Sequence, residues 1–591
     1  MEITRLFDFL TYQLKNKPLE DALVSKKNGK WIKTSTQEYQ DQADQISRGL
    51  LRLGVKPGDH IALIVTTNRT EWNIMDIGLQ QIGVISVPVY PTISPTEFKY
   101  IFNQAGVKIA FVSDSDLYEK MLLTKPHTPN LVGVYTFDKV ESAANWNEIL
   151  DMGKDASNQN EVDEIKNSIK TEDIATIIYT SGTTGNPKGV VLTHQNIVSN
   201  ALASKERVPD MGSDSRALSF LPICHVFERM LIYLYQYESI SIYYAESIEA
   251  IGDNLKEVKP TVMTVVPRLV EKVYAKIYDK GSNAGGIKTK LFMWALGLVK
   301  SYEPFKKMPF IWNLQYKIAS ALVFSKWREG VGGNMVVMVS GSAKLSERLN
   351  KLFWAAGIPI LEGYGLTETS PVISVNSMNA EGFANGSVGT PLKNVDVKIA
   401  PDGEILVKGP GVFKEYYQQP ELTKEVFTDD GYFKTGDIGE FKNDLLFITD
   451  RKKQIFKTSG GKYVAPQIIE NAMKAIPFIE QIMVVGEGQK MPAAIIQPNF
   501  DYIREFVKKN ELPFDNPSNE DIAKSKALKG LIEEQIKMIN QQFGKWEQIK
   551  AFELTPEVWT IEDGLLTPTL KHKRKEIQAK YIDLYNKMYE V

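Results

Sequence analysis

The sequence predicts an α/β protein with a large N-terminal domain of two α/β sheets and a small β-rich subdomain, followed by a smaller mobile α+β C-terminal domain. Three observations support this prediction. The chain has 591 residues, which is too long for one small domain. From residue 60 onward, short β-branched runs alternate with helical segments. After about residue 371, and again after residue 450, that alternation is replaced by other patterns.

The alternation begins in the first third of the chain. Strands are predicted at 61–65, 84–89 and 107–112, with helices at 71–81 and 95–104 between them. Strands that alternate with helices in this way form a mostly parallel sheet covered by helices.

A second sheet is predicted because the same pattern returns in the middle of the chain. A strand at 262–266 precedes a helix that begins at Pro267 and stops at Gly281, and a strand at 335–339 precedes a helix ending near Gly357. Both helix boundaries carry the residue types that favour them.

The last two hundred residues predict different architecture. Glycine-rich strands at 386–391 and 403–411 indicate a β-rich subdomain at about 372–448. Beyond it we expect a helix at 463–474, strands at 481–486 and 493–497, and a long polar helix at 521–543. We place the boundary at Asp450, which gives domains 1–449 and 450–591, the second near the usual size of an independent domain.

Composition excludes several protein classes. Lys and Arg total 70 against 72 Asp and Glu, so overall charge would not hold this chain on nucleic acid or on acidic lipid. The single cysteine, Cys224, cannot form an intramolecular disulfide or a thiolate zinc cluster. Residues 1–10 contain Glu2, Arg5 and Asp8 where a signal peptide needs an apolar core. We therefore expect a cytoplasmic protein.

Segment 287–327 is unusual for a soluble enzyme, because aromatic and aliphatic residues are mixed with lysines and almost no acidic residues. One interpretation is a basic amphipathic hairpin that touches the inner face of a membrane peripherally. The other is that these helices pack on the main sheet. Both stay open from the sequence.

The most informative segment for function is residues 179–189. An apolar strand at 174–178 leads into a turn rich in glycines and hydroxyls, and a second strand follows at 190–193. Glycines let backbone N–H groups approach phosphate oxygens, hydroxyls add donors and a lysine adds a cation. The candidate phosphate-binding residues are Thr180, Ser181, Gly182, Thr183, Thr184, Gly185 and Lys188. Pro187 stands where a Walker A loop needs glycine, which disfavours an ordinary NTPase.

This loop resembles the phosphate loop of the adenylate-forming superfamily of AMP-binding enzymes, which join a carboxylate to AMP. Residues 362–369 resemble the adenine and metal motif of that family. The resemblance implies that Tyr364 stacks on adenine, that Thr367 lies near the α-phosphate, and that Glu368 binds Mg²⁺, with the hydroxyl of Thr180 as a further candidate ligand. It also implies nucleotide contacts from Glu362, Gly363, Gly365, Gly341, Ser342 and Ala343.

Further matches follow in the family's order. Asp437 resembles the residue that accepts hydrogen bonds from both ribose hydroxyls, and Arg451 would assist there. Lys453 corresponds to the family's hinge, about which the C-terminal domain is expected to swing. Lys571 corresponds to the lysine that reaches the carboxylate and the α-phosphate during adenylation.

Within the superfamily, the chain is most similar to the long-chain fatty acid CoA ligases, in segments 221–229, 450–457 and 460–466. This resemblance implies contacts with CoA from Lys457, Gly460 and Gly461, although Lys462 stands where the branch usually has glutamate. His225 would be a gate or pocket residue rather than a base. A Cys224–His225 nucleophile is disfavoured, because sequence neighbours rarely face each other.

The expected reaction has two steps, in which ATP and a fatty acid form an acyl-adenylate and CoA then takes the acyl group. Mg²⁺ is the expected metal, with ATP and CoA as co-substrates. One alternative is a fatty acyl-AMP ligase that loads a carrier protein. Another is a membrane-associated, nucleotide-binding scaffold without turnover. Acyl chain length and oligomeric state are not determined by these residues.

Overall fold

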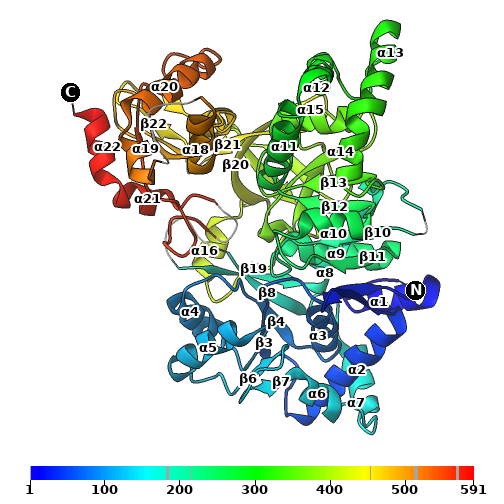
Figure 1. Cartoon of the computed structure of the whole chain (residues 1–591). Coiled ribbons are helices and arrows are strands. Elements are labelled where there is room, and N and C mark those ends of the chain that lie inside the picture. Colours follow the sequence, from blue (N-terminus) through cyan, green and yellow to red (C-terminus); the bar gives the residue numbers. More distant parts are fainter. Residues whose placement is uncertain are drawn as a thin grey trace. The chain divides into compact units, whose positions relative to one another are not determined.

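The computed structural model describes residues 2–180, 186–212, 214–452, 454–510, 517–567 and 571–590. The chain forms two compact units of unequal size (Figure 1). Unit 1 comprises Met1–Lys398, Leu406–Lys434 and Phe441–Phe447, and unit 2 comprises Ile399–Ile405, Thr435–Glu440 and Ile448–Val591. Sheets and helices occur in both units, and the predicted α/β class with a smaller C-terminal part is confirmed.

The first sheet of unit 1 has nine strands in the order β16-β15-β14-β13-β12-β10-β11-β1-β2. It is parallel from β14 to β1, and the strands at its two edges are antiparallel. The strands are β1 (Leu23–Lys27), β2 (Lys30–Thr34), β10 (Arg216–Ser219), β11 (Ser241–Tyr244), β12 (Val262–Val265), β13 (Val337–Ser340), β14 (Ile360–Gly365), β15 (Val372–Val375) and β16 (Thr390–Pro391).

The second sheet of unit 1 has eight strands in the order β19-β9-β8-β4-β3-β5-β6-β7. It is parallel from β8 to β7, while β9 runs antiparallel to both β8 and β19. The strands are β3 (His60–Ile64), β4 (Ile85–Pro88), β5 (Ile109–Val112), β6 (Gly133–Thr136), β7 (Ala144–Asn145), β8 (Ile174–Thr180), β9 (Lys188–Thr193) and β19 (Glu415–Tyr416).

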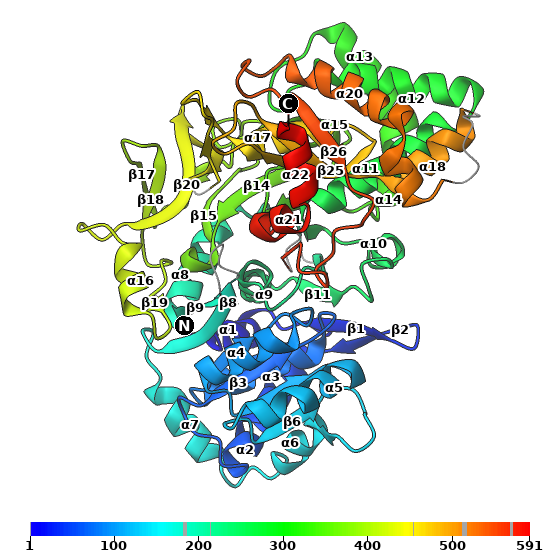
Figure 2. The ribbon, with the colours of Figure 1, turned by 90° about the vertical axis from the view of Figure 1, so that its left-hand side faces the viewer.

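Helices cover both sheets, as Figure 2 shows for α3 and α5 on the eight-stranded sheet. The helices of unit 1 are α1 (Asp8–Asn16), α2 (Thr36–Arg52), α3 (Thr70–Gln81), α4 (Pro95–Ala105), α5 (Ser115–Thr124), α6 (Trp146–Met152), α7 (Gln159–Ser168), α8 (His194–Ser204), α9 (Val226–Glu238), α10 (Ile251–Val258), α11 (Pro267–Ser282), α12 (Gly286–Val299), α13 (Phe310–Ala319), α14 (Ser325–Gly330), α15 (Glu347–Ala355) and α16 (Pro420–Glu425). Among the helices of the described residues, none has the length and apolarity that crossing a membrane would need.

Helix α9 lies between the two sheets. Every residue from Val226 to Gln236 is buried. A helix buried on all sides is usually apolar all round, but this stretch contains two charged residues. Glu228 accepts hydrogen bonds from hydroxyls in β10 and β12 of the nine-stranded sheet. The next residue, Arg229, donates to hydroxyls in β4 and β8 of the eight-stranded sheet. Adjacent residues of one helix therefore bind both sheets.

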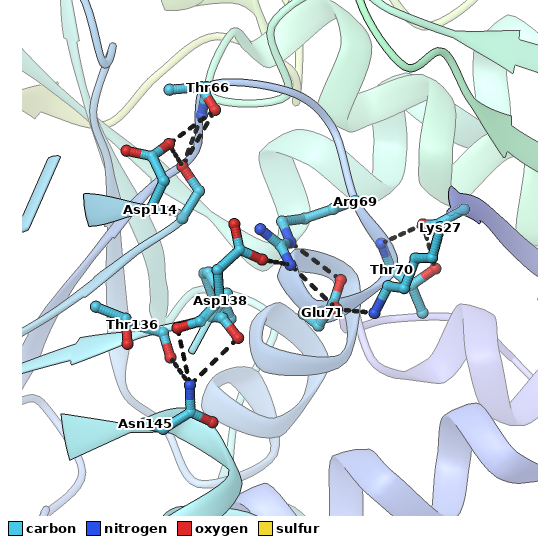
Figure 3. Close-up of polar contacts among 12 residues, drawn as sticks. Lys27, Thr66, Arg69, Thr70, Glu71, Asp114, Thr136, Asp138 and Asn145 are labelled. Carbon is cyan, nitrogen blue, oxygen red and sulfur yellow. Dashed lines mark hydrogen bonds and ion pairs between the residues drawn. The ribbon is translucent and has the colours of Figure 1, made fainter. Parts of the chain in front are cut away.

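A second polar connection joins the sheets at the start of α3 (Figure 3). Glu71 accepts a hydrogen bond from Lys27 of β1 at 2.7 Å and from Arg69 at 3.0 Å and 3.2 Å. Arg69 also donates to Asp138 at 2.8 Å. Burial alone would raise the pKa of Glu71, but Arg69 and Lys27 outweigh it and lower the pKa to about 2. The carboxylate is thus charged at neutral pH and ties β1 to α3.

Unit 2 contains a three-stranded sheet, β24-β25-β26, and a two-stranded hairpin, β22-β23. Strands β24 and β25 are antiparallel, and β26 is parallel to β25. Its elements after residue 455 are β22 (Phe456–Lys457), β23 (Tyr463–Val464), α17 (Pro466–Met473), β24 (Ile479–Val485), β25 (Ala493–Pro498), α18 (Phe500–Lys509), α19 (Asn519–Lys524), α20 (Lys526–Asn540), β26 (Ala551–Leu554), α21 (Arg574–Lys580) and α22 (Ile582–Tyr589).

The region predicted as a β-rich subdomain contains the remaining strands, whose residues are divided between the two units. These strands are β17 (Asp396–Ile399), β18 (Glu404–Lys408), β20 (Phe433–Lys442) and β21 (Leu445–Arg451). The domain boundary at 450 and the limits 372–448 stay predictions.

Two predicted helices differ from those observed. The helix expected at 463–474 begins only at Pro466, because Tyr463 and Val464 pair with β22 in a hairpin. The long helix expected at 521–543 is divided at Ser525, whose side chain accepts a hydrogen bond from the Leu528 N–H at 3.3 Å. A serine that caps one helix in this way stops the preceding one, because it takes non-helical dihedrals.

Candidate functional site

The strands on either side of the predicted phosphate loop form an antiparallel pair. In this pair Thr180, the last residue of β8, is the register partner of Lys188, the first residue of β9. The intervening Ser181, Gly182, Thr183, Thr184 and Gly185 lie outside the described residues. The pairing brings together Thr180 and Lys188, the residues at the two ends of the predicted phosphate loop.

Tyr416 connects this loop to the predicted metal ligand. It lies in β19, where it pairs with Val190 of β9, and the Lys188 Nζ atom is 5.2 Å from the centre of its ring. Its hydroxyl donates a hydrogen bond to Glu368 Oε1 at 2.8 Å. Burial and the Glu368 carboxylate both raise the pKa of Tyr416, so the hydroxyl stays a neutral donor. Lys188, Tyr416 and Glu368 thus form one cluster, which we call the Tyr416 cluster.

Tyr416 is not predicted from the sequence, because a tyrosine in a two-residue strand belongs to no motif of its own. Its position depends on which strand pairs with β9. A weaker sequence signal for buried polar contacts near this cluster lies in α8, where two asparagines four residues apart interrupt an apolar helix.

Those asparagines, Asn196 and Asn200, hold the segments around the cluster. Asn200 Nδ2 donates to the carbonyls of Thr369 and Val372 at 3.3 Å and 2.8 Å. Asn196 Nδ2 donates to the carbonyls of Pro410 and Val412 at 2.8 Å and 2.9 Å. Both side chains are buried, so these bonds satisfy amide groups that water does not reach. They fix the turns that carry Glu368 and precede Tyr416.

The predicted adenine motif ends strand β14. Gly365 approaches the chain so closely that a Cβ atom there would lie 1.8 Å from the Pro371 carbonyl oxygen. A side chain at this position is therefore excluded. Tyr364 and Gly363 pair with Ser374 and Val375 of β15. Thr367 lies in the same turn as Glu368, the single-turn helix η4 (Thr367–Thr369).

Glu362 precedes this motif, and its side chain points into the protein. Its carboxyl group accepts hydrogen bonds from the Leu345 N–H at 3.0 Å and from Asn350 at 3.1 Å. Burial raises the pKa of Glu362 to about 7. These contacts support the chain just beyond Gly341, Ser342 and Ala343, so Glu362 holds the second predicted adenine segment in place.

Segment 341–343 follows the end of β13 and meets the first turn of α9. A Cβ atom on Gly341 would lie 3.0 Å from Phe227 Cε1, and Ser342 has a positive φ of 69°. The predicted adenine segment therefore depends on Phe227, which belongs to the motif at 221–229.

His225 begins helix α9. Its Nδ1 atom accepts a hydrogen bond from the Phe227 N–H at 3.2 Å, which is a helix-capping contact. While Nδ1 accepts this hydrogen bond it cannot accept a proton, and the role of His225 as a gate or pocket residue stays a prediction. The neighbouring Cys224 is buried, and burial raises the pKa of its thiol, so it is not a thiolate nucleophile.

The loop that leads to His225 is held by buried polar groups. Asn68 donates to the Ser219 hydroxyl at 2.8 Å and to the Leu221 carbonyl at 2.7 Å, and accepts from the Ile223 N–H at 3.0 Å. Ser219 and Thr264 in turn lie 2.5 Å and 2.7 Å from the carboxyl oxygens of Glu228. Burial raises the pKa of Glu228 to about 7, although both hydroxyls lower it.

Replacing Glu228 by glutamine is expected to make the protein more stable at pH 8 than the natural chain. Folding raises the pKa from 4.5 to about 7, so the unfolded state binds fewer protons in that range and stability falls as pH rises through it. The loss amounts to about 3 kcal/mol by pH 8. A glutamine side chain would keep the two hydroxyl contacts without a charge, and urea unfolding at pH 5 and pH 8 measures the difference. An unchanged pH dependence in Glu228→Gln would contradict this assignment.

In unit 2, the two residues predicted to bind ribose lie together. Arg451 Nε is 3.2 Å from Asp437 Oδ1. Asp437 is 4% exposed and lies in β20, where its backbone N–H donates to the Thr435 hydroxyl at 3.1 Å. The arginine orients a carboxylate that could accept hydrogen bonds from two hydroxyl groups.

The residues predicted to contact CoA lie in the β22-β23 hairpin and its turn. Lys457 ends β22, and its Nζ atom is 5.4 Å from the centre of the Tyr463 ring. Gly461 has a positive φ of 77° and donates to the Thr458 carbonyl at 2.9 Å. Gly460 precedes it in the same exposed turn. Lys453, the predicted hinge, lies outside the described residues.

Lys571 is joined to Thr567 by two hydrogen bonds in unit 2. Its carbonyl accepts from the Thr567 N–H at 2.8 Å, and its own N–H donates to the Thr567 hydroxyl at 3.0 Å. The side chain is exposed. The backbone around the lysine is therefore fixed although its side chain reaches outward.

Two family models match the chain. The model for AMP-binding enzymes matches residues 10–417, and the model for the C-terminal domain of AMP-binding enzymes matches residues 453–590. The chain is also similar to the long-chain-fatty-acid–CoA ligase FadD15 of Mycobacterium bovis, at 32% identity over 95% of this chain and 93% of the relative. Long-chain-fatty-acid–CoA ligase 5 of Mus musculus is 32% identical over 95% of this chain and 84% of its own length.

Solved structures share the fold. The didomain of a carboxylic acid reductase from Segniliparus rugosus in complex with AMP has a TM-score of 0.75 at 20% identity, covering 100% of this chain and 82% of that one. ATP-bound MatB from Rhodopseudomonas palustris has a TM-score of 0.69 at 21% identity, covering 99% and 100%. With a family model matched over more than half of its length and relatives matched over nearly all of it, this chain belongs to the AMP-binding enzymes.

Proposed function

We propose that this protein is an ATP-dependent long-chain fatty acid:CoA ligase that forms acyl-CoA, AMP and pyrophosphate through an acyl-adenylate. The observation that carries the proposal is the Tyr416 cluster. It places a lysine and a candidate magnesium carboxylate beside the two strands that enclose the phosphate loop. The long-chain assignment rests on the names of relatives that match nearly the whole chain.

Magnesium fits the Tyr416 cluster. A hard cation prefers carboxylate oxygens, and Mg²⁺ usually keeps waters and bridges phosphates, so Glu368 with Thr180 as a further candidate is a sufficient protein contribution. When bound, the ion neutralises charge on the triphosphate. Tyr416 holds the Glu368 carboxylate in one orientation, and Lys188 adds a fixed positive charge near the loop.

The first step joins the fatty acid to AMP. The carboxylate oxygen attacks the α-phosphorus and pyrophosphate leaves, so no protein nucleophile is needed. Thr367 and Lys571 are assigned to the α-phosphate, and Lys571 offsets the repulsion between carboxylate and phosphate. We assign adenine to Tyr364 with the segments around Gly341 and Gly363.

The second step transfers the acyl group to CoA. The thiol attacks the acyl carbon and AMP leaves, which is feasible because AMP is a far better leaving group than an oxide. Asp437 and Arg451 are assigned to the ribose, and Lys457, Gly460 and Gly461 to CoA. Since Lys571 serves only the first step, we propose that the part of the chain after residue 450 swings about Lys453 between the steps.

Replacing Tyr416 by phenylalanine is expected to raise the Mg²⁺ concentration needed for half-maximal activity about tenfold, because partners that orient a metal ligand contribute to metal affinity. The ring beside Lys188 would remain, so activity at saturating Mg²⁺ should fall less. A titration of AMP formation against Mg²⁺ measures both. Tyr417→Phe, one residue further along, is the matched control, and equal shifts in the two variants would contradict the role of Tyr416.

A coupled assay of AMP formation across C2 to C20 acids, with and without CoA, tests the proposed function. We expect acid-dependent pyrophosphate release and acyl-CoA formation with the longer acids. Adenylation without acyl-CoA release would favour the alternative of an acyl-AMP ligase that loads a carrier protein. No palmitate-dependent pyrophosphate release would favour the alternative of a nucleotide-binding scaffold without turnover.

We also propose that helices α12 and α13 touch an anionic membrane surface peripherally, at the inner face. Both helices lie at the end of unit 1 remote from the eight-stranded sheet (Figures 1 and 2). One side packs inward through Phe292 of α12 and Ala319 of α13. Exposed apolar residues at helical spacing lie on α13 and on the turn Ser320–Phe324 that continues it, and we call this surface the α13 face: Phe310, Ile311, Leu314, Ile318 and Leu322.

Charge supports an anionic bilayer as the partner. Segment 287–327 contains seven lysines and one acidic residue, Glu303. Exposed apolar side chains beside lysines are the pattern of helices that lie in the interface of anionic membranes. The side chains of Phe310 and Ile311 are 82% and 71% exposed. Trp312 is instead stacked on Tyr302 and Tyr316, so it holds the helices together rather than inserting.

Flotation with vesicles tests this surface. Replacing Phe310, Ile311 and Leu314 by serine should reduce recovery with phosphatidylglycerol-containing vesicles about tenfold, with little binding to neutral vesicles in either protein. The matched control replaces Leu122, Leu123 and Val132, which are also exposed, by serine. Equal flotation of the α13-face variant and the natural protein would overturn the proposal.

A further inference from the structure

The residues that follow Lys571 also pair with residues 565 and 566 of unit 2. Leu566 and His572 form an isolated antiparallel bridge, and the Lys573 N–H donates to the Leu565 carbonyl at 2.9 Å. In extended backbone, neighbouring side chains point to opposite sides. The exposed Lys571 and the half-buried His572 follow this rule.

The imidazole of His572 has specific partners in unit 2. Its Nε2 atom lies 3.1 Å from Gln481 Oε1 in β24. Because an amide oxygen only accepts hydrogen bonds, Nε2 carries the proton in this contact. The ring also packs edge-on against the buried Trp559, with centres 5.4 Å apart and planes at 83°.

The residues after His572 strengthen the attachment. Arg574 donates to Glu470 at 2.7 Å and to the Val484 carbonyl at 2.5 Å. Glu470 also accepts from the Val484 N–H at 2.7 Å. Both His572 and Arg574 therefore bind strand β24, and these contacts hold the backbone next to Lys571.

We propose that His572 is a positioning residue for adenylation, which holds the backbone of Lys571 on β24 through Gln481 and Trp559. The proposal rests on the proposed role of Lys571 as the lysine of the first step. It predicts that loss of the His572 contact harms that step alone, since Lys571 is not used in acyl transfer to CoA.

The imidazole acts without charge. Burial lowers the pKa of His572 well below its usual value, and the nearby Lys474 and Arg574 lower it further. Of the charged groups near it, Glu470 is already engaged by Arg574. A neutral side chain with an N–H donor at the position of Nε2 should therefore replace the histidine, and glutamine provides one.

The test measures the two half-reactions separately in the full chain. Acid-dependent ATP–pyrophosphate exchange reports the first, and CoA-dependent consumption of synthetic palmitoyl-AMP reports the second. We expect His572→Ala and Gln481→Leu each to lower the first about 10- to 100-fold, as small misplacements of a reacting group do. The second should stay within about twofold, and His572→Gln should restore most of the exchange activity.

Two reference variants make each outcome decisive. Gln548→Leu removes another half-buried glutamine of unit 2, whose amide donates to the carbonyls of Asn540 and Phe543. A loss in His572→Ala no larger than in Gln548→Leu, or an equal loss in both half-reactions, would overturn the proposal. Lys571→Ala separates the two hypotheses: if it leaves exchange intact, the proposed role of Lys571 fails and not only that of His572.

Discussion

Replacing Lys571 by alanine is expected to lower the rate of acyl-adenylate formation about 10²- to 10³-fold. The reaction brings a carboxylate against a phosphate, and like charges oppose that approach. A lysine beside the reacting groups offsets this repulsion as the new bond forms. The hydrogen bond from the Lys571 N–H to the Thr567 hydroxyl does not involve the lysine side chain, so the variant should lose the charge and keep this contact. Acid-dependent ATP–pyrophosphate exchange measures the effect.

The second half-reaction is the internal control for Lys571→Ala. Consumption of synthetic palmitoyl-AMP in the presence of CoA should continue at a near-normal rate, because that step does not use the lysine. Lys573→Ala, two residues away, controls for the loss of one positive charge in this basic segment. Near-normal exchange in Lys571→Ala would remove this residue from the mechanism.

Replacing Asp76 by alanine is expected to lower the free energy of unfolding by about 3–5 kcal/mol. Arg229 is completely buried in α9, and its Nη2 atom lies 2.6 Å from Asp76 Oδ1. Tyr233 donates to the other carboxylate oxygen, and Arg229 also donates to Thr176 at 2.8 Å. Without Asp76, a guanidinium would remain in the interior with no opposing charge among these partners.

Two controls distinguish a buried ion pair from general damage. Asp253→Ala breaks an exposed pair with Lys256 and should change stability by less than about 1 kcal/mol. The double variant Asp76→Leu, Arg229→Met should recover much of the loss, since removing both charges leaves nothing unpaired. Urea unfolding followed by tryptophan fluorescence measures all three. A double variant as unstable as Asp76→Ala would show that the charge is not the cause.

The burial of helix α9, which carries Arg229, could not be predicted from the sequence. Segment 221–229 carries part of the family resemblance, but its residues do not by themselves predict a helix buried between two sheets. Glu228 and Arg229 look like the polar face of a surface helix when taken alone. Their partners, Ser219 and Thr264 for one and Thr176 and Asp76 for the other, come from strands and a helix far apart in the chain.

Local patterns predicted the fold class and most strand and helix positions, and the nucleotide-binding residues were proposed from a resemblance to a family. These features depend on the order of residues within ten or twenty positions, where periodicity and glycine placement act directly. The prediction of one helix at 521–543 was wrong at Ser525. The sequence does not distinguish a serine inside a polar helix from a serine that caps one.

The tertiary structure alone decided which side chains support the motifs. Tyr416 reaches Glu368 only because β19 pairs with β9. His572 reaches Gln481 only because the residues after Lys571 lie beside β24. Such contacts join residues separated by many elements, and a single sequence carries no record of which strands become neighbours. The residues of the reaction could therefore be proposed from motifs, whereas the residues that position them became visible only in the folded chain.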